Sequence, residues 1–349
     1  MDEIPEAVGS YATVPHLPLS CPHYSKSCDT CRILGVIETL SERKTELWPR
    51  LSLDDWSATQ ATLHRWTQIV GKTRLALSPM QNHWWHVALY VTARGLTTSP
   101  IPSGTAAFEA EFDFIDHALM IRTNEGEVGV VPLVARSVAE FYSDYMSVLR
   151  SLGIDVKIRP VPSEMADTTP FIDDRVHASY DGDAVQRCWQ ILVHADRALK
   201  EFRGKFLGKS SPSHFWWGGF DISCTRFSGQ RAPQHPGGVP NLPDWVTREA
   251  YSHECISAGW WPGTVGSPVA EPAFYAYAYP EPAGCDVAPI KPATASYNNT
   301  MREWILPYDS VRTSETPQQD LKEFLQSTYE AAADLGRWDR NALEREPLR

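Results

Sequence analysis

Four histidines that lie among aromatic residues are the sequence's candidates for proton transfer. His83 and His86 enclose two tryptophans. His214 begins an aromatic run, and His253 stands directly before Glu254. A histidine side chain ordinarily titrates near pH 6.5, and a glutamate can exchange protons in the same range when burial raises its pKa. We therefore expect general acids and bases at these five positions.

The spacing of these residues also allows simpler structural roles. Successive side chains on a strand alternate between its two faces, so His83 and His86 would point in opposite directions. They cannot bind the same metal ion unless the strand is bulged or begins after His83. The same alternation separates His253 from Glu254. A core or surface role is therefore an equal alternative at these positions.

A metal centre is a second chemistry that these residues could support. Imidazoles and carboxylates are ligands of zinc and of non-haem iron, so we expect such an ion, if one is bound, at His214, His253 and Glu254. The HExxH pattern of zinc proteases is absent, because residue 257 is Ser. A cofactor-free enzyme that uses acid–base chemistry alone is a close alternative.

Aromatic and charged residues near these histidines predict a pocket for a small molecule. Trp85, Trp217 and Tyr275 would line it. Asp221 and Arg226 lie in an otherwise apolar strand, and buried charges need a partner, either each other or a polar substrate. We expect Asp221 to bind the substrate and Arg226 to hold an anionic group of it. A structural ion pair is the alternative.

The segment EPAFYAYAY has its tyrosines on one face and its alanines on the other. The small side chains of Ala276 and Ala278 would allow a helix to pack closely. Tyr275, Tyr277 and Tyr279 would then form a stripe on the opposite face. Such a stripe could stack on a ligand, or it could fill a core with its hydroxyls bonded at the rim.

The N-terminal segment holds a separate cluster of potential ligands. The run CPHYSKSCDTC places four of them within eleven residues, close enough for one tetrahedral zinc ion: Cys21, His23, Cys28 and Cys31. Free or redox-active thiols are the simpler interpretation, because the spacing matches no zinc-finger pattern. Seven cysteines in a chain that begins without a secretory signal favour a reduced protein. We expect a cytoplasmic location.

The charge balance bears on the kind of partner. The chain has 32 Lys and Arg against 43 Asp and Glu, which gives a net charge of −11. Nucleic acids and anionic membrane surfaces both attract clustered basic residues, so we expect neither as a partner. No run of apolar residues approaches the roughly 18 that a membrane span needs. The expected partner is a small-molecule substrate or ligand.

Periodicity and turn residues predict the elements that position these groups. Helices are expected at residues 54–71, 138–152, 184–206 and 318–335. Strands are expected at residues 74–77, 83–93, 107–114, 119–123, 126–133, 154–159, 214–226, 252–261, 272–279 and 303–306. Each half runs from a helix through strands to a closing helix, and the similar strings NHWW and SHFWW follow the first helix of each. This parallel suggests an internal duplication.

These elements predict an α+β fold of two similar halves, each a helix–antiparallel sheet–helix unit, packed as one body. The predicted parts are an extension, a first half and a second half, at residues 1–46, 47–165 and 166–349. If the duplication is real, His83 and His214 are equivalent and could converge on a cleft between the halves, a favoured place for a ligand. The irregular segment 227–245, rich in Pro and Gly, would form a loop over that cleft.

Strings along nearly the whole chain carry a family resemblance: NHWWHVALYVTARGLTTSPIP, FEAEFDFIDH, FRGKFLGKSSPSHFWWGGFD, TRFSGQRAP, PNLPDW, YSHE and EPAFYAYAYPEP. In this order they resemble the domain-of-unknown-function family 5996, whose members are uncharacterised microbial proteins. The resemblance extends from Leu47 to Leu343 and leaves the cysteine-containing N-terminus outside. It implies one integrated unit and no established activity.

We therefore expect a small-molecule enzyme of specialised metabolism, with its site in an aromatic-lined cleft between the halves. A non-catalytic protein that closes an aromatic pocket around a polar ligand is the alternative. A structural or interaction protein is a third class, and it would leave no cavity beside the polar residues.

Overall fold

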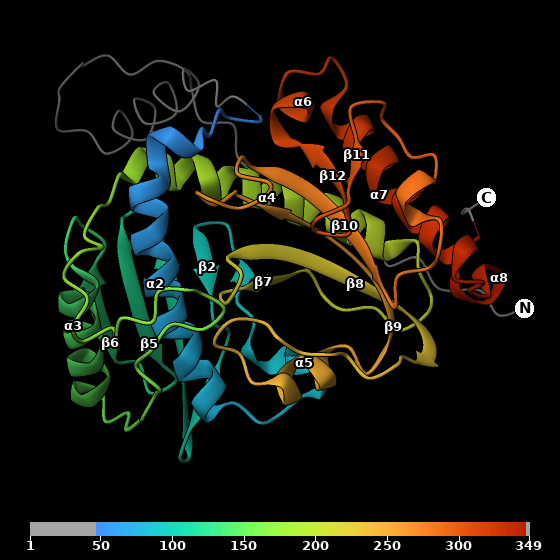
Figure 1. Ribbon diagram of the computed structural model, residues 1–349. Coiled ribbons are helices and arrows are strands. Elements are labelled where there is room, and N and C mark those ends of the chain that lie inside the picture. Colours follow the sequence, from blue (N-terminus) through green and yellow to red (C-terminus); the bar gives the residue numbers. More distant parts are fainter. Residues whose placement is uncertain (1–46, 347–349) are drawn as a thin grey trace, which may run out of the picture. The chain divides into compact units, whose positions relative to one another are not determined.

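Two antiparallel sheets of six strands each organise the chain (Figure 1). The computed structural model describes residues 47–346, which lie within one compact unit. Helices flank both sheets, so the predicted α+β class is confirmed. One prediction lies outside the described residues: the zinc or free-thiol cluster of Cys21, His23, Cys28 and Cys31.

The first sheet has the strand order β1-β2-β4-β5-β6, and β3 pairs with β4. Its strands are β1 (Tyr90–Val91), β2 (Gly95–Thr97), β3 (Ile101–Ser103), β4 (Ala106–Asp113), β5 (Ala118–Thr123) and β6 (Val128–Pro132). The helix α3 (Val138–Ser151) packs against β6. Ser137 and Glu140 close its N-terminus with a reciprocal capping box. The bounds of α3, β4, β5 and β6 agree closely with the prediction, whereas β2 and β3 were not predicted.

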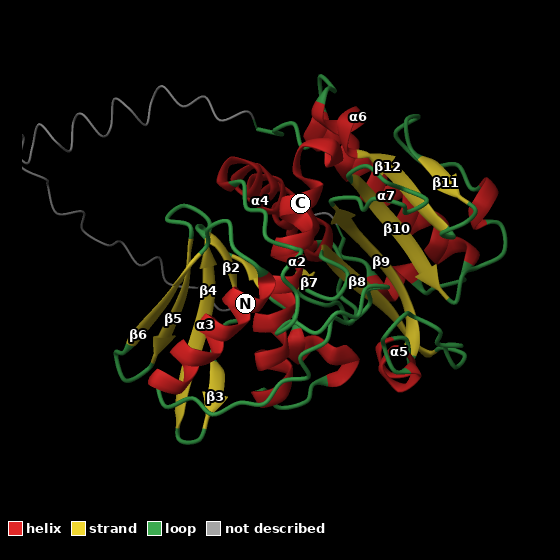
Figure 2. Ribbon diagram, turned by 60° about the vertical axis from the view of Figure 1, so that its left-hand side comes forward, coloured by secondary structure: helices red, strands yellow, loops and turns green. Residues whose placement is uncertain are grey.

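The second sheet has the strand order β11-β12-β10-β9-β8-β7. Its strands are β7 (His214–Trp216), β8 (Asp221–Arg231), β9 (His253–Trp261), β10 (Ala273–Tyr279), β11 (Ser296–Asn298) and β12 (Glu303–Pro307). The long helices α4 (Gly182–Gly204) and α7 (Pro317–Leu335) pack against its central strands. Figure 2 shows the two sheets as separate groups of strands.

The alternation predicted for EPAFYAYAY is confirmed in β10 for the tyrosines and Ala276. Tyr275, Tyr277 and Tyr279 line a cavity, whereas Ala276 is fully buried in the core. Ala278, expected on the face opposite the tyrosines, also lines the cavity. The helix α7 packs on β10, and its own Ala332 and other small residues are buried there. One face of this sheet is therefore a helix-covered core, and the other face is aromatic.

Short helices complete the described part: η1 (Asn82–Val87), α5 (Asp244–Ala250), η2 (Cys285–Val287), α6 (Tyr308–Arg312) and α8 (Arg340–Leu343). Figure 1 shows α5 on the opposite side of β8 from α4. None of the helices within residues 47–346 combines the length and the apolar character needed to cross a membrane.

The first helix is longer than predicted. The helix α2 runs over Leu53–Leu77, so it includes Gly71, the expected end, and the residues expected to form a strand at 74–77. Gly71 serves packing and does not stop the helix. A Cβ atom at this position would lie only 2.2 Å from the indole ring of Trp217. The missing side chain therefore allows α2 and Trp217 to approach closely.

The strand predicted at residues 83–93 is largely wrong. The segment forms the 3₁₀-helix η1, and only Tyr90–Val91 are paired as a strand. His83 and Trp84 have φ angles of 56° and 62°, in the left-handed region that costs an ordinary residue about 1–2 kcal/mol. Such a turn has no signal in hydrophobic alternation.

Two further strand predictions are corrected by turns and loops. Residues 214–226 form two strands, because the chain reverses between Trp216 and Asp221, which pair with each other. Residues 154–159 have no regular structure. The segment 227–245 is irregular only in its middle, since β8 continues to Arg231 and α5 begins at Asp244. The internal duplication and the boundary between halves at 165/166 stay predictions.

Substitution of Gly71 by Ala tests the close contact with Trp217. Alanine favours a helix interior by about 1 kcal/mol over glycine, so helix propensity alone predicts stabilisation. The overlap with the indole predicts the opposite, a loss of about 1–3 kcal/mol in the free energy of unfolding. Urea denaturation of both proteins measures the difference.

The matched control is Gly204→Ala at the last residue of α4. A Cβ atom at this position meets no other atom within 4 Å. We expect Gly204→Ala to be neutral or stabilising. Equal effects of the two substitutions would contradict a special role for Gly71.

Candidate functional site

A cavity of about 1290 Å³ opens on the aromatic face of the second sheet. Its walls come from β8, β9, β10 and β12 on one side, and from α2, η1, α5 and residues 157–164 on the others. Residues of both predicted halves and of the segment 227–245 therefore line it. This volume exceeds the roughly 300–1,000 Å³ typical of small-molecule sites, which leaves room for a ligand together with water.

Aromatic rings make up much of the cavity wall. They come from six tryptophans, four tyrosines and one phenylalanine: Trp84, Trp85, Trp216, Trp217, Trp245, Trp261, Tyr251, Tyr275, Tyr277, Tyr279 and Phe227. Such rings bury large apolar areas and offer flat faces on which a ligand can stack. The cavity is thus suited to a molecule with flat or apolar surfaces as well as polar groups.

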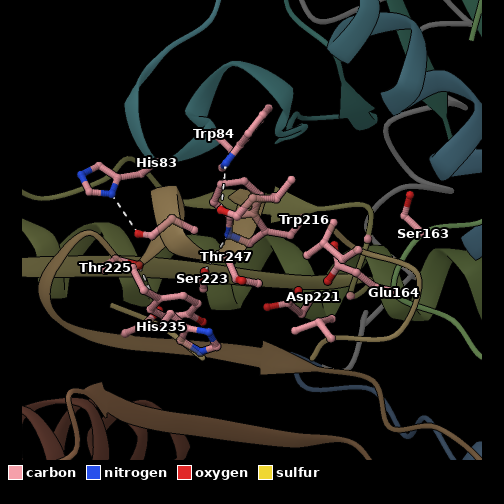
Figure 3. Close-up of a pocket in the computed structure, with 18 of the residues that line it drawn as sticks. His83, Trp84, Ser163, Glu164, Trp216, Asp221, Ser223, Thr225, His235 and Thr247 are labelled. Atoms are coloured by element: carbon pink, nitrogen blue, oxygen red, sulfur yellow. Dashed lines mark hydrogen bonds between the residues drawn. The ribbon is translucent and has the colours of Figure 1, made fainter. Parts of the chain in front are cut away.

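Four carboxylates line this cavity; Glu281 pairs with Arg302, and the other three come from separate elements. Asp221 begins β8, Glu303 begins β12, and Glu164 lies in the irregular segment before α4. Figure 3 shows Glu164 and Asp221 at the same end of the cavity, away from His83. The negative charge of Asp221 raises the pKa of both Glu164 and Glu303.

Burial raises the pKa of each carboxylate, and the charge of Asp221 adds to the shift of the other two. Desolvation raises the pKa of Asp221 to about 6, although a hydrogen bond from Tyr275 opposes the shift. Desolvation and the charge of Asp221 raise the pKa of Glu164 to about 7. The same two causes raise the pKa of Glu303 to about 7. All three groups consequently change protonation state near neutral pH.

Tyrosine hydroxyls of the cavity form hydrogen bonds with Asp221 and with each other. The hydroxyl of Tyr275 donates to Asp221, and Tyr251 and Tyr277 share a hydrogen bond of 2.8 Å. Burial raises the pKa of Tyr275 well above its usual value, and the neighbouring charge of Asp221 adds to this effect. The phenol therefore stays protonated and remains a donor to Asp221.

Two glycines allow the polar side chains to approach the backbone. A Cβ atom at Gly218 would lie 2.0 Å from a carboxylate oxygen of Glu164. A Cβ atom at Gly259 would lie 2.6 Å from the hydroxyl of Tyr275. Gly218 lies in the turn between β7 and β8. In the structure its close neighbour is the chain's own Glu164.

A polar face of α2 borders the same end of the cavity. The ammonium group of Lys72 donates to the hydroxyl of Ser163 at 2.7 Å. One turn earlier, the Gln68 amide accepts from the backbone N–H of Ser163 at 2.7 Å and donates to its carbonyl at 2.9 Å. Desolvation and the charge of Arg159 lower the pKa of Lys72 to about 8, with Glu164 opposing the shift.

His83 lines the cavity, but protein groups use both of its ring nitrogens. Nδ1 lies 2.9 Å from the carbonyl oxygen of Ala250 and must donate to it, so Nε2 accepts from the Lys209 ammonium at 2.7 Å. Burial lowers the pKa of His83, and the charges of Lys209 and His253 add to this. These contacts leave neither nitrogen free for a substrate.

The predicted histidines do not come together in the cavity. His86 is buried outside the cavity lining and accepts a hydrogen bond from the backbone of Gln81. His214 packs against the rings of Trp85 and Trp216, and neither of its ring nitrogens has a partner among the described residues. Burial lowers the pKa of His214 to about 3, so its ring is neutral at physiological pH.

Three further predicted groups also lie outside the cavity lining. His253 begins β9, where its ring lies 5.6 Å from that of His83. Glu254 accepts a hydrogen bond of 2.8 Å from Ser228. Arg226 is on the helix-covered face, where its guanidinium donates to the carbonyl of Phe202 and lies 3.4 Å from the centre of that residue's ring. This placement turns Arg226 away from any substrate in the cavity.

The predicted ligand set His214, His253 and Glu254 is likewise dispersed. Within residues 47–346, no group of three or more His, Cys, Asp or Glu side chains is arranged to hold a metal ion. The zinc or non-haem iron expected from the sequence therefore has no ligand set in this part of the chain.

Four of the predicted binding residues do line the cavity: Trp85, Trp217, Asp221 and Tyr275. Trp217 is held by a hydrogen bond of 2.8 Å from its indole nitrogen to the carbonyl of Val87. The ring of Trp85 lies against His83 and Phe227.

The sequence prediction missed Glu164, Glu303 and the polar face of α2. Glu164 lies in a segment without periodicity, so no pattern marked it. The face of α2 did carry a signal, because His64, Gln68 and Lys72 recur at intervals of four within an apolar helix. Polar residues that share one face of a buried helix require polar partners.

Asp221→Asn tests the mutual repulsion in the cavity. A carboxylate whose pKa is raised on folding stabilises the folded chain at low pH, and this contribution is lost as pH rises through the folded pKa. Relative to the wild type, Asp221→Asn should therefore gain about 1–2 kcal/mol of unfolding free energy between about pH 4 and pH 7. Chemical denaturation at a series of pH values measures this difference.

The comparison must be made between variants, because His64 and His214 act in the opposite direction. Burial lowers the pKa of both histidines, so their contribution to stability rises with pH in either protein. Asp113→Asn is the matched control. Although burial opposes the shift, hydrogen bonds from Arg94 and the backbone lower the pKa of Asp113. Relative to the wild type, Asp113→Asn should lose stability as pH rises to about 4 and then keep a constant deficit up to about pH 7, because a lowered carboxyl pKa adds stability only as pH approaches the unfolded pKa. A gain of stability by both variants between about pH 4 and pH 7 would refute the assignment.

The comparisons with known proteins bear on the chain as a whole. Residues 48–345 match the model of a family described as "Family of unknown function (DUF5996)". No curated protein and no solved structure matches the chain. The match covers both sheets and every element that lines the cavity. The chain therefore belongs to the family DUF5996.

Proposed function

We propose that this protein is an enzyme that transforms a small polar molecule in the aromatic cavity. Its acid–base groups would be Asp221, Glu303 and Glu164. One observation carries the proposal: three carboxylates with raised pKa values, brought from separate elements, face one water-accessible cavity. None of the three forms an ion pair with a Lys or Arg in the described part of the chain.

Such an arrangement costs free energy and is suited to catalysis. Desolvating like charges near one another destabilises the folded chain, so a purely structural role is a poor explanation for it. A carboxyl group with a pKa between about 6 and 7 is present in both protonation states at neutral pH. One member can therefore donate a proton while another accepts one.

The proposal moves the acid–base role from the histidines to the carboxylates. The ring nitrogens of His83 are already bonded, and His86, His214 and His253 do not line the cavity. The hydroxyl of Tyr275 would orient Asp221 and keep one of its oxygens occupied. The free oxygen of Asp221 then remains available to a substrate.

A non-catalytic binding protein is the second candidate, and the aromatic lining favours it. Aromatic rings of η1, α5 and the second sheet could enclose a ligand without changing it. The two candidates differ in their products. An enzyme releases an altered molecule, whereas a binding protein returns its ligand unchanged.

Untargeted mass spectrometry of a metabolite mixture tests the proposal. The mixture is incubated with the wild type and with Asp221→Asn, Glu303→Gln and Glu164→Gln variants. We expect compounds that are consumed by the wild type, with rates lowered about 10²- to 10⁴-fold in at least one variant. Compounds retained by the protein but recovered unchanged would favour the binding candidate.

Glu111→Gln is the control for loss of a carboxylate. Glu111 pairs with Arg122 on the first sheet and does not line the cavity. This variant should consume the same compounds at the wild-type rate. Equal turnover by the three cavity variants and by Glu111→Gln would contradict the proposal.

The partner and location proposed for the chain follow from the same features. We propose a small-molecule partner and no nucleic acid, supported by the cavity and by the net charge of −11. We also propose a cytoplasmic location. Four buried cysteines of the described residues are unpaired thiols, which supports a reducing compartment: Cys188, Cys224, Cys255 and Cys285.

A further inference from the structure

A serine of the cavity wall is held in an unusually defined position. Gln68 bonds both the backbone N–H and the carbonyl of Ser163, so the residue cannot rotate away from α2. Lys72, one helical turn after Gln68, places its ammonium 2.7 Å from the Ser163 hydroxyl. Ser163 also lines the cavity proposed as the reaction site.

We propose that Ser163 is a nucleophile, with Lys72 as its general base, and that the substrate is an acyl donor such as an ester or amide. This inference rests on the proposed function, because it takes the same cavity as the reaction site. A lysine can activate a serine as its general base, provided that the lysine nitrogen lies within hydrogen-bond distance of the serine hydroxyl. The distance between Lys72 Nζ and Ser163 Oγ meets this condition.

The step balances with groups that line the cavity. Neutral Lys72 takes the proton of the Ser163 hydroxyl as Oγ forms a bond to the carbonyl carbon. The bond from that carbon to the leaving oxygen or nitrogen then breaks, and the Lys72 ammonium returns the proton to the leaving group. Water that enters the cavity hydrolyses the acyl-serine, and the hydroxyl is restored.

The surroundings of Lys72 favour a neutral amine. The side chain is only 4% exposed, and it lies against the Trp217 ring, 5.4 Å from its centre. No carboxylate lies within salt-bridge distance of Nζ in the described residues. Arg159 disfavours the ammonium form and Glu164 favours it, and the resulting pKa is about 8. A useful fraction of the base is therefore deprotonated at neutral pH.

A fluorophosphonate probe tests the nucleophile without knowledge of the substrate. Attack by Ser163 forms an O–P bond and releases fluoride, with the hydroxyl proton passing to Lys72. The full-length chain is incubated with the probe, and intact mass and peptide mapping locate the adduct. We expect one adduct, on Ser163, with a labelling rate that increases as pH rises through about 8.

Variants separate the base from a merely structural lysine. Lys72→Arg keeps the positive charge but cannot accept a proton, so it should lower the labelling rate at least about 100-fold. Lys72→Met should do the same. Ser163→Ala should take no label. Ser223→Ala is the matched control, because Ser223 is another cavity serine whose hydroxyl accepts from Trp216, and it should label like the wild type.

The outcomes distinguish this inference from the proposed function. Thermal unfolding first establishes that each variant is folded, and the pH profile of the wild type needs no variant at all. No adduct, an adduct elsewhere, or wild-type labelling of Lys72→Arg overturns the nucleophile. If the Asp221 and Glu303 variants then still lose turnover, the acid–base proposal stands without it. If Ser163 is labelled but the Asp221 and Glu303 variants keep full turnover, the nucleophile stands and the acid–base proposal fails.

Discussion

The contact between Gly71 and Trp217 sets the distance between α2 and the turn that joins β7 to β8. With no side chain on Gly71, the indole lies directly against the helix backbone. Trp217 in turn bonds the carbonyl of Val87, which ties η1 to the same point. His64, two turns before Gly71, bonds the carbonyls of Trp217 and Gly218. Three segments far apart in sequence therefore meet at one ring.

The polar end of the cavity depends on that meeting point. Glu164 packs against Gly218, and Lys72 lies over the face of Trp217. Asp221 follows directly after the turn. The cavity thus has an aromatic wall of low polarity and also enough charge to bind a polar molecule. The charged groups are held where α2 contacts the turn between β7 and β8.

Much of the fold could be predicted from local patterns. The strands of β4, β5 and β10 and the helices α3, α4 and α7 have regular periodicity, and each buries one face against a neighbour. The alternation in β10 also predicted correctly that Tyr275 and Ala276 lie on opposite faces, since Tyr275 lines the cavity and Ala276 lies in the core.

The site was less predictable, because it depends on departures from those patterns. Gly71 looks like a helix end in sequence, and only the Trp217 ring explains it. The left-handed turn at His83 is stabilised by bonds to α5, more than 160 residues away along the chain, which no local rule can anticipate. Arg226 has a charge suited to a substrate, but its position on the even-numbered face of β8 places it among aromatic rings of the core. Residue type indicated chemistry, and tertiary contacts decided which residues could take part in it.

The pairing of Leu89 with Phe215 covers one edge of the second sheet. Leu89 and Phe215 exchange two backbone hydrogen bonds of 2.9 Å, so the segment before β1 covers the edge strand β7. The other edge of that sheet, β11, has only three residues, and β1 at the edge of the first sheet has two. Exposed strand edges are templates for pairing between molecules, and long ones promote aggregation. Short and covered edges allow this chain to keep a cavity open on its tyrosine- and tryptophan-rich sheet face while resisting edge-to-edge polymerisation.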